Sequence, residues 1–220
     1  MRLLLISDVH GNFRAFGPEN YIGLGIELCL VAGDLTNIGK RRMNECEQAR
    51  SWLAELGQLF PVLFIFGNHD IGLSEVDFEN ICNVQCIEDK VVEVNGIRVA
   101  GVSMSPCYDM PSLADNWVRM TADPAMEVLA YVGLPQADIV VSHCPPFGIR
   151  DKTAPIRNPD GTWEGRHIGS LSLAEYAVLY HPKLIVCGHV HEAHGKEWLS
   201  YEGGSTLVVN TACKAHVVEV

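Results

Sequence analysis

Five short apolar segments of this sequence each end next to a residue of a type that binds metal ions. Each is rich in Val, Ile or Leu, and each is followed by Gly or Ser and then by Asp, Asn or His. The segments are residues 3–6, 28–32, 62–66, 139–141 and 184–187. Short apolar runs closed by such turn residues are typical of β-strands that are buried on both faces. The core is therefore predicted to consist mainly of sheet.

Helical patterns separate these predicted strands. Residues 44–59 carry apolar side chains at helical spacing with charges between them, which predicts an amphipathic helix. Residues 170–180 predict a shorter helix that stops before Pro182, and residues 124–131 predict one that begins with proline. Strands that alternate with helices predict an α/β protein in which sheets pack together with helices outside.

Further strands are predicted late in each half of the chain. Residues 91–94 and 98–102, joined around Asn95-Gly96, predict a β-hairpin, and residues 207–209 and 216–220 predict two more strands. At 220 residues with 48% hydrophobic residues, we expect one domain over residues 1–220.

Two stretches follow predicted core strands without a regular pattern. Residues 103–123 and 144–169 are rich in Pro, Gly, Asp and Arg, and we expect both to be irregular loops. Long loops within a compact domain are usually functional or disordered.

Composition restricts the partners and the compartment. The formal net charge is −11, so the surface repels duplex nucleic acid, and a small anion binds only where divalent cations reverse the local sign. The N-terminal apolar run lacks the features of a signal peptide, and no run is long enough to span a bilayer. We therefore expect a cytoplasmic protein that does not enter membranes. Its eight cysteines are expected to be reduced, as structural or incidental residues.

The residues at the strand ends form a candidate metal site. Asp8 and His10 stand two positions apart, as do His189 and His191, and extended backbone turns such pairs to one side, where both can reach one ion. The other three predicted strands are each followed by a single candidate ligand, which is Asp34, Asn68 or His143. Ligands gather at the carboxyl ends of strands in open α/β sheets, and these N and O donors exceed the needs of one ion. Each motif alone is weak, but together they predict two divalent ions held by Asp8, His10, Asp34, Asn68, His143, His189 and His191.

The motifs occur in the order Asp8-Val9-His10-Gly11-Asn12, Gly33-Asp34, Gly67-Asn68-His69-Asp70, Ser142-His143 and Gly188-His189-Val190-His191. This set resembles the calcineurin-like metallophosphoesterase superfamily. Residues 142–151 and 182–189 resemble its small metallophosphoesterase-domain branch more closely. The resemblance implies a four-layer α/β/β/α sandwich with two central mixed sheets.

The resemblance also implies how the ligands divide. One ion would take Asp8, His10, Asp34 and His191, and the other would take Asp34, Asn68, His143 and His189, with Asp34 shared. The ions would be manganese, iron, zinc or related metals. Hydrolysis would proceed by in-line attack of a metal-bound hydroxide, with His69 as the general acid. Asp70 would either orient His69 and raise its pKa or simply cap a turn.

A motif that is missing bears on the substrate. Protein Ser/Thr phosphatases of the superfamily continue their Gly-Asp motif with a further Asp-Arg, whereas Gly33-Asp34 is followed here by Leu35-Thr36-Asn37. This difference argues against a protein phosphatase. The resemblance to the small branch implies a small phosphodiester as substrate, with cyclic nucleotides as the leading class. Two alternatives stay open: a phosphomonoesterase acting on a small metabolite or nucleotide, and a non-catalytic nucleotide-binding protein.

The loop 144–169 is the predicted place of substrate contacts. Phe147 and Trp163 offer aromatic faces for stacking and Arg150 offers charge, with Arg157 and Arg166 nearby in the sequence. The alternative is that both aromatic residues only anchor the loop. His167 and His194 are expected to be second-shell or surface residues rather than ligands.

Overall fold

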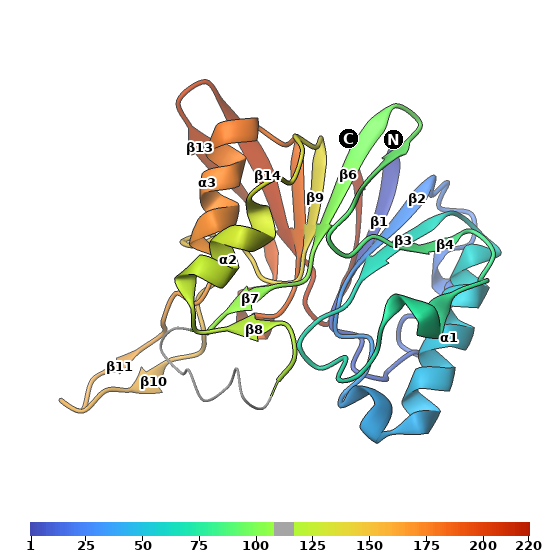
Figure 1. The fold of residues 1–220 in the computed structure, drawn as a ribbon, viewed down its shortest axis with the longest axis horizontal. Coiled ribbons are helices and arrows are strands. Elements are labelled where there is room, and N and C mark those ends of the chain that lie inside the picture. Colours follow the sequence, from blue (N-terminus) through green and yellow to red (C-terminus); the bar gives the residue numbers. More distant parts are fainter. Residues whose placement is uncertain (108–116) are drawn as a thin grey trace.

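Two mixed β-sheets face each other at the centre of the molecule, and helices cover their outer faces (Figure 1). The computed structural model describes residues 1–107 and 117–220, without the side chains of Arg41 and Met43. The C-terminal strand lies beside the N-terminal strand, so the two ends of the chain meet (Figure 1).

The first sheet contains the N-terminal strands. Its order is β15-β1-β2-β3-β4, in which β1 to β4 are parallel and β15 is antiparallel to β1. The strands are β1 (Arg2–Ile6), β2 (Leu28–Ala32), β3 (Val62–Ile65), β4 (Val84–Cys86) and β15 (Ala215–Glu219).

The second sheet has the order β13-β14-β12-β9-β6-β5. Its four inner strands are parallel, whereas β13 and β5 are antiparallel to their neighbours. The strands are β5 (Val91–Val94), β6 (Ile97–Val102), β9 (Ile139–Ser142), β12 (Leu184–Cys187), β13 (Gly195–Tyr201) and β14 (Gly204–Asn210).

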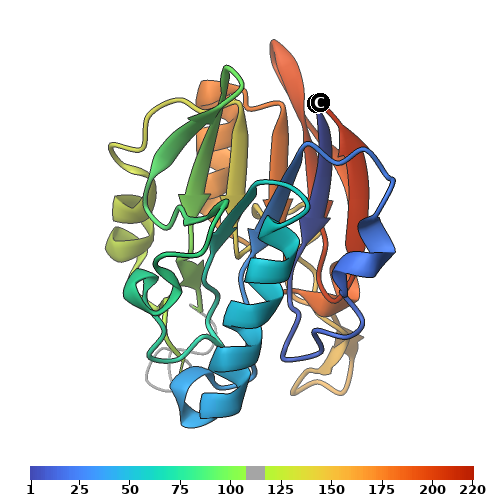
Figure 2. The ribbon, with the colours of Figure 1, turned by 90° about the vertical axis from the view of Figure 1, so that its right-hand side faces the viewer.

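Three α-helices form the outer layers. Helix α1 (Met43–Gly57) packs against the first sheet, while α2 (Pro124–Tyr131) and α3 (Leu171–Tyr180) pack against the second (Figures 1 and 2). In the described parts of the chain, short 3₁₀ helices occur in the connections: η1 (Pro18–Tyr21), η2 (Gly39–Arg41), η3 (Glu75–Phe78) and η5 (His191–Ala193). Within the described parts of the chain, no helix is long and apolar enough to cross a membrane.

Strand alternation divides the core into three parts. In β1, Leu4 packs in one cluster with Trp52 of α1, whereas Leu5 packs in another with Val186 of the second sheet. Residues of the second sheet that point the other way form a third cluster with α2 and α3. Successive strand residues point to opposite faces, so strands that are apolar throughout build a core on each side. The predicted four-layer sandwich with two mixed sheets is confirmed.

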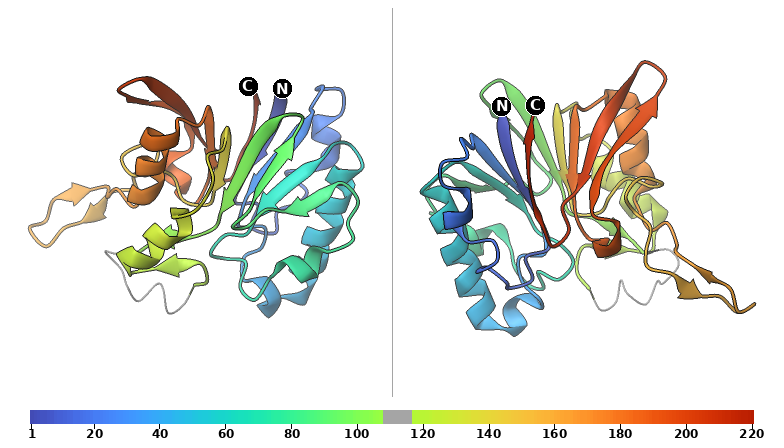
Figure 3. Two further views of the ribbon diagram at one scale, coloured as in Figure 1. Left: turned by 45° about the horizontal axis from the view of Figure 1, so that its top comes forward. Right: turned by 180° about the vertical axis from the view of Figure 1, so that it is seen from behind.

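The predicted elements agree with the observed ones to within a few residues. The differences are strands that were not predicted, and two pairs of them lie in the stretches expected to be irregular. Short strands pair there: β7 (Ser105–Pro106) with β8 (Met120–Thr121), and β10 (Ile156–Arg157) with β11 (Trp163–Glu164). The second pair forms an arm that projects from the body (Figures 1 and 3). Two-residue strands are too short to leave a periodic pattern, and β4 and β13 were missed because polar residues interrupt them.

Candidate metal centre

All seven predicted ligands lie just after the carboxyl ends of β1, β2, β3, β9 and β12. These strands are parallel within each sheet, and their ends lie at the same side of the sandwich (Figure 2). The structure therefore brings side chains from both sheets to one place.

The first group of side chains gathers around Asp8. His191 Nε2 lies 3.0 Å from Asp8 Oδ1 and His10 Nε2 lies 3.7 Å from the same oxygen. His10 Nε2 is also 3.3 Å from His191 Nε2 and 3.7 Å from Asp34 Oδ2. Two imidazole nitrogens and two carboxylates thus point at one volume.

The second group gathers around the side-chain oxygen of Asn68. His143 Nε2 and His189 Nδ1 each lie 2.9 Å from Asn68 Oδ1. His143 Nε2 lies 3.4 Å from Asp34 Oδ2, the same oxygen that faces His10 in the first group. Asp34 therefore stands between the two groups, where a shared carboxylate is needed.

The backbone around these residues differs from the prediction. Asp8, His10 and His189 were expected on extended strand ends, but their φ angles are 55°, 47° and 67°, and His191 begins η5. The chain turns sharply at each strand end, so the Asp8–His10 pair comes together through a turn rather than a strand. His189 and His191 separate, one toward Asn68 and the other toward Asp8. A left-handed residue costs about 1–2 kcal/mol, which the surrounding structure must offset.

Glycines admit the side chains at these crowded turns. A Cβ atom at Gly67 would lie 2.7 Å from the His143 ring and would overlap Asp34 Oδ1. A Cβ atom at Gly188 would overlap Asp8 Oδ2 and Ser7 Oγ. The glycines of the Gly-Asn and Gly-His motifs are therefore required by close approach to the carboxylates.

Hydrogen bonds outside the groups fix the orientation of the donors. His143 Nδ1 lies 2.8 Å from the carbonyl oxygen of Ala32, which can only accept, so Nδ1 carries a hydrogen and Nε2 faces the groups. Asp8 accepts from Ser7 Oγ at 2.6 Å and from the backbone N–H of His189 at 3.0 Å. Hydrogen bonds from neighbouring groups that hold the donor side chains in place are typical of metal sites.

The charges of this buried site are strongly coupled. Burial disfavours charge on Asp34, but the positive charge of His143 outweighs it and holds the pKa of Asp34 below its usual range. Burial likewise opposes charge on His143, yet Asp34 and Asp8 raise its pKa to about 9. The two carboxylates thus stabilise positive charge at this place. Carboxylate, imidazole and amide donors suit borderline or hard divalent ions, so the residues present fit a metal centre.

His69 lies beside the first group. Its Nδ1 is 2.7 Å from the carbonyl oxygen of Asn37, and its backbone N–H donates to Asp34 Oδ1 at 2.8 Å. Its ring contacts the His10 ring edge to face, with centroids 4.7 Å apart. His69 also offers a donor atom close enough to His10 and Asp34 to serve as a ligand.

The sequence leaves two roles open for Asp70, and the structure shows the one in which it caps turns. Its carboxylate accepts from the backbone N–H groups of Leu35, Thr36 and Gly67 and from the Thr36 hydroxyl, at 2.9–3.3 Å. The His69 ring is instead oriented by Asn37. Asp70 thus joins the turn after β2 to the turn after β3.

Two features of the site were missed in the sequence. Trp117 stacks on His69 with ring centroids 4.1 Å apart, and Glu45 holds Asn37 through bonds of 2.9 and 3.1 Å. Trp117 lies in a stretch without pattern, and Glu45 resembles any charged residue of an amphipathic helix. Neither carries a local signal, because each reaches the site only through the tertiary fold.

Three predicted substrate residues lie apart from the ligand groups. Phe147 is 43% exposed and packs on His167, with ring centroids 5.6 Å apart. Arg150 donates to the Lys196 carbonyl oxygen and pairs with Glu197 at 3.0 Å. Trp163 is 67% exposed on the projecting arm. Within the described residues, none of the three contacts a predicted ligand.

His167 and His194 contact groups other than the side-chain oxygens of the predicted ligands. His167 Nδ1 lies 2.6 Å from Asp151 Oδ1, in the loop after β9. His194 Nδ1 lies 3.3 Å from the His191 carbonyl oxygen, and its Nε2 is 2.7 Å from Lys214 Nζ. His194 thus lies next to the first group through the backbone of His191.

Sequence comparison decides the family. The profile of the calcineurin-like phosphoesterases matches residues 1–193, which include every predicted ligand. The chain belongs to the calcineurin-like phosphoesterase family. Membership supports a metal-dependent phosphoester hydrolase, and with the Asp and His clusters it supports binding of divalent metal.

Several known proteins are similar to this chain. A UPF0046 protein of Caenorhabditis elegans is 26% identical over 98% of this chain and 76% of its own length. Metallophosphoesterase domain-containing protein 1 of Homo sapiens is 24% identical over 96% of this chain and 66% of its own length. Among solved structures, GAP50, the anchor in the inner membrane complex of Plasmodium, is similar with a TM-score of 0.48 and 11% identity, over 96% of this chain and 71% of that one.

Proposed function

We propose that this calcineurin-like phosphoesterase hydrolyses small phosphodiesters, with cyclic nucleotides as the leading substrate class. The observation that carries the proposal is the shared position of Asp34, whose Oδ2 faces His10 on one side and His143 on the other. Two groups of donors joined by one carboxylate are the arrangement that a dinuclear centre needs.

The residues divide between two divalent ions. Asp8, His10, Asp34 and His191 hold one, and Asp34, Asn68, His143 and His189 hold the other. When bound, such ions lower the pKa of a coordinated water and offset charge on the phosphoryl oxygens. Manganese, iron and zinc all suit this mixture of nitrogen and oxygen donors.

His69 supplies the proton that the leaving group requires. Water adds to phosphorus and gives up a proton to solvent as the P–O ester bond breaks, and the leaving alkoxide takes a proton from Nε2 of the His69 imidazolium. Asn37 accepts from Nδ1 and so keeps Nε2 directed away from the backbone, toward the site. Trp117, stacked on His69, limits the movement of the ring.

The charge of the site favours diesters over monoesters. A monoester carries two negative charges near neutral pH and a diester carries one. Within residues 1–107 and 117–220, no arginine or lysine makes a hydrogen bond or ion pair with the seven ligands or His69. Arg119 and Arg150, whose bonds are made elsewhere, pair with Glu88 and Glu197. Ligands that have no arginine or lysine as a partner favour the singly charged ester.

Hydrolysis of bis-p-nitrophenyl phosphate and p-nitrophenyl phosphate, with Mn²⁺ supplied, tests the proposal. We expect higher kcat/KM for the diester, two ions per chain by metal analysis, and turnover of cyclic nucleotides in a panel that includes dinucleotides and monoesters. A preference for monoesters would show that the protein is a phosphomonoesterase rather than a diesterase. Fewer than one ion per chain with no turnover would favour a non-catalytic nucleotide-binding protein.

A matched pair of variants assigns the activity to this site. Asp34→Asn removes the shared carboxylate and should lower turnover by at least about 100-fold. Asp160→Asn, on the projecting arm, changes the same functional group away from the site and should leave turnover unchanged.

A further inference from the structure

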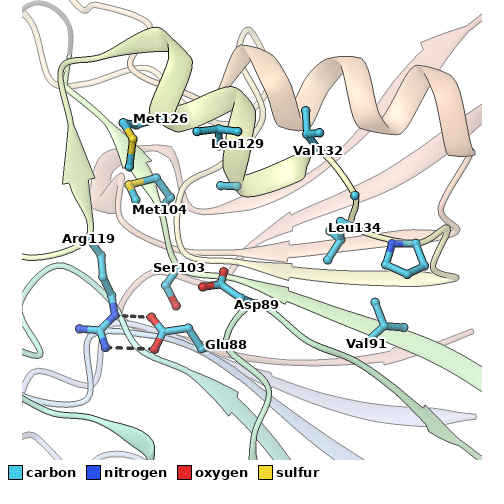
Figure 4. A pocket seen from close by; sticks show the side chains of 13 residues that line it. Glu88, Asp89, Val91, Ser103, Met104, Arg119, Met126, Leu129, Val132 and Leu134 are labelled. Atoms are coloured by element: carbon cyan, nitrogen blue, oxygen red, sulfur yellow. Dashed lines mark hydrogen bonds and ion pairs between the residues drawn. The ribbon is translucent and has the colours of Figure 1, made fainter.

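A cavity of about 500 Å³ lies beneath α2, on the side of the helix that faces strands β5 and β6 (Figure 4). One wall consists of α2, the residues that follow it and Met104, and the other consists of Glu88, Asp89, Val91, Ser103 and Arg119. None of the predicted metal ligands lines it, so it is separate from the metal centre.

The wall formed by α2 is apolar and open to solvent. Met126, Leu129 and Val132 are 46%, 61% and 66% exposed, and Met104 completes this side (Figure 4). Large apolar side chains that are half exposed around a concavity gain stability when a ligand covers them. The size of the cavity lies in the range of small-molecule sites.

The opposite wall is polar and carries one uncompensated charge. Arg119 donates through Nε and Nη2 to both carboxylate oxygens of Glu88, so this pair is neutral. Asp89 points into the space between the walls, and its carboxylate makes no hydrogen bond or ion pair within the described ranges (Figure 4). The cavity therefore contains one net negative charge.

A second polar group in this wall lacks a partner. Ser103 is 2% exposed, and its hydroxyl has no hydrogen-bond partner among the residues that the structure describes. Buried hydroxyls are usually bonded, and an exception commonly marks a place for water or a ligand. Burial and the charge of Glu88 also raise the pKa of Asp89, and the charge of Arg119 only partly offsets them.

We propose that this cavity binds an amphipathic organic cation, with its ammonium group beside Asp89 and Ser103 and its apolar body against α2. Charge complementarity selects the ligand: an anion would meet Glu88 and Asp89, and an uncharged apolar molecule would bury the Asp89 carboxylate without a partner. An ammonium group can donate to the Asp89 carboxylate, and the Ser103 hydroxyl lies in the same wall.

Three naphthalene probes with one apolar body test the role of charge: 1-naphthylmethylammonium, 1-naphthylmethanol and 1-naphthoate. Binding is followed by the methyl signals of Met104 and Met126 in ¹³C NMR spectra, with Met1 as an internal control outside the cavity. This readout does not depend on activity or on bound metal. We expect saturable shifts of both methyl signals with the ammonium probe, weaker binding of the alcohol and none of the naphthoate.

Variants locate the binding. Asp89→Asn keeps the shape and suits the left-handed backbone at φ 54°, and it should weaken binding of the ammonium probe by at least about ten-fold while sparing the alcohol. Ala130→Phe, which fills the cavity, should abolish binding of both probes. Glu202→Gln, an exposed carboxylate outside the cavity, should change neither.

Three outcomes would overturn the proposal. They are the absence of methyl shifts at millimolar ammonium probe, equal affinity for the ammonium and the alcohol, and unchanged ammonium binding in Asp89→Asn. If Ala130→Phe fails to fold, as circular dichroism would reveal, the Asp89→Asn comparison decides alone.

Discussion

The ring of His69 is fixed by a backbone oxygen: its Nδ1 lies 2.7 Å from the carbonyl oxygen of Asn37. A carbonyl oxygen only accepts hydrogen bonds, so Nδ1 carries a hydrogen in either charge state, and the proton available for transfer is the second one, which Nε2 holds in the imidazolium form. Asn37 in turn donates from Nδ2 to the His10 carbonyl oxygen at 2.7 Å. One residue thus sets the position of the proposed acid relative to a proposed ligand.

The loss of kcat on replacing His69, the proposed acid, should depend on the leaving group of the ester. A His69→Ala variant should lose roughly 100-fold in kcat on alkyl phosphodiesters and much less on p-nitrophenyl esters, because p-nitrophenolate leaves without a proton. Steady-state kinetics on both ester types check this, with metal content measured in parallel. His69 also lies within ligand distance of His10 and Asp34, so equal losses on both esters, or loss of metal, would show that it acts otherwise.

Glu45 should contribute to activity without contact to the substrate. It accepts from the Asn37 N–H and Nδ2, so Glu45→Ala frees the residue that orients His69. We expect roughly a ten-fold fall in kcat on alkyl esters with KM and metal content little changed. Glu47→Ala, an exposed change on the same helix, serves as the control. A fall in metal content that parallels kcat would contradict the positioning role.

The same contacts make stability depend on pH. Burial disfavours charge on Glu45, but bonds from Asn37 and Arg42 outweigh it and lower its pKa. A carboxylate with a lowered folded pKa stabilises the protein above its unfolded pKa, and this contribution is lost as the pH falls through the folded pKa. Urea unfolding with EDTA should therefore show a difference between wild type and Glu45→Gln at pH 7 that shrinks below about pH 4.5. A difference independent of pH would contradict this assignment.

The sequence predicts the sheets and the ligands well, because both leave local signals. Strands such as β2 are apolar on both faces, and a residue such as Asp34 follows the strand end directly. The backbone of the ligand turns could not be predicted, since Asp8 and His189 adopt left-handed angles that their residue types rarely take. Trp117 and Glu45 were missed because they act across the fold.

The glycine before Asn68 should be as necessary as the ligands. In Gly67→Ala the new methyl group would overlap Asp34 Oδ1 and lie 2.7 Å from the His143 ring, so the shared carboxylate must move. We expect loss of at least one ion per chain by metal analysis and at least about a 100-fold loss of turnover. Gly204→Ala is the control, because its methyl group would meet only the Tyr201 ring, at 3.3 Å. Full metal content in Gly67→Ala would show that the turn can relax.

Asp70 should matter more for stability than for chemistry. Its Oδ1 accepts from the Thr36 N–H and hydroxyl, and its Oδ2 accepts from the N–H groups of Gly67 and Leu35. In Asp70→Asn the amide nitrogen must replace one oxygen, so either orientation leaves a buried N–H group facing another donor. An unsatisfied buried donor costs about 1–3 kcal/mol.

A second effect of the same substitution acts in the opposite direction. Burial and the charge of Asp34 raise the pKa of Asp70 to about 6, so removal of the charge relieves part of this cost. We expect the lost bonds to outweigh the relief, because the buried amide nitrogen is left facing at least one N–H donor. We expect Asp70→Asn to lower the free energy of unfolding by about 2 kcal/mol in urea titrations with EDTA. Glu55→Gln, an exposed change on α1, should leave it unchanged, and an unaltered value for Asp70→Asn would mean that charge relief balances the lost bonds.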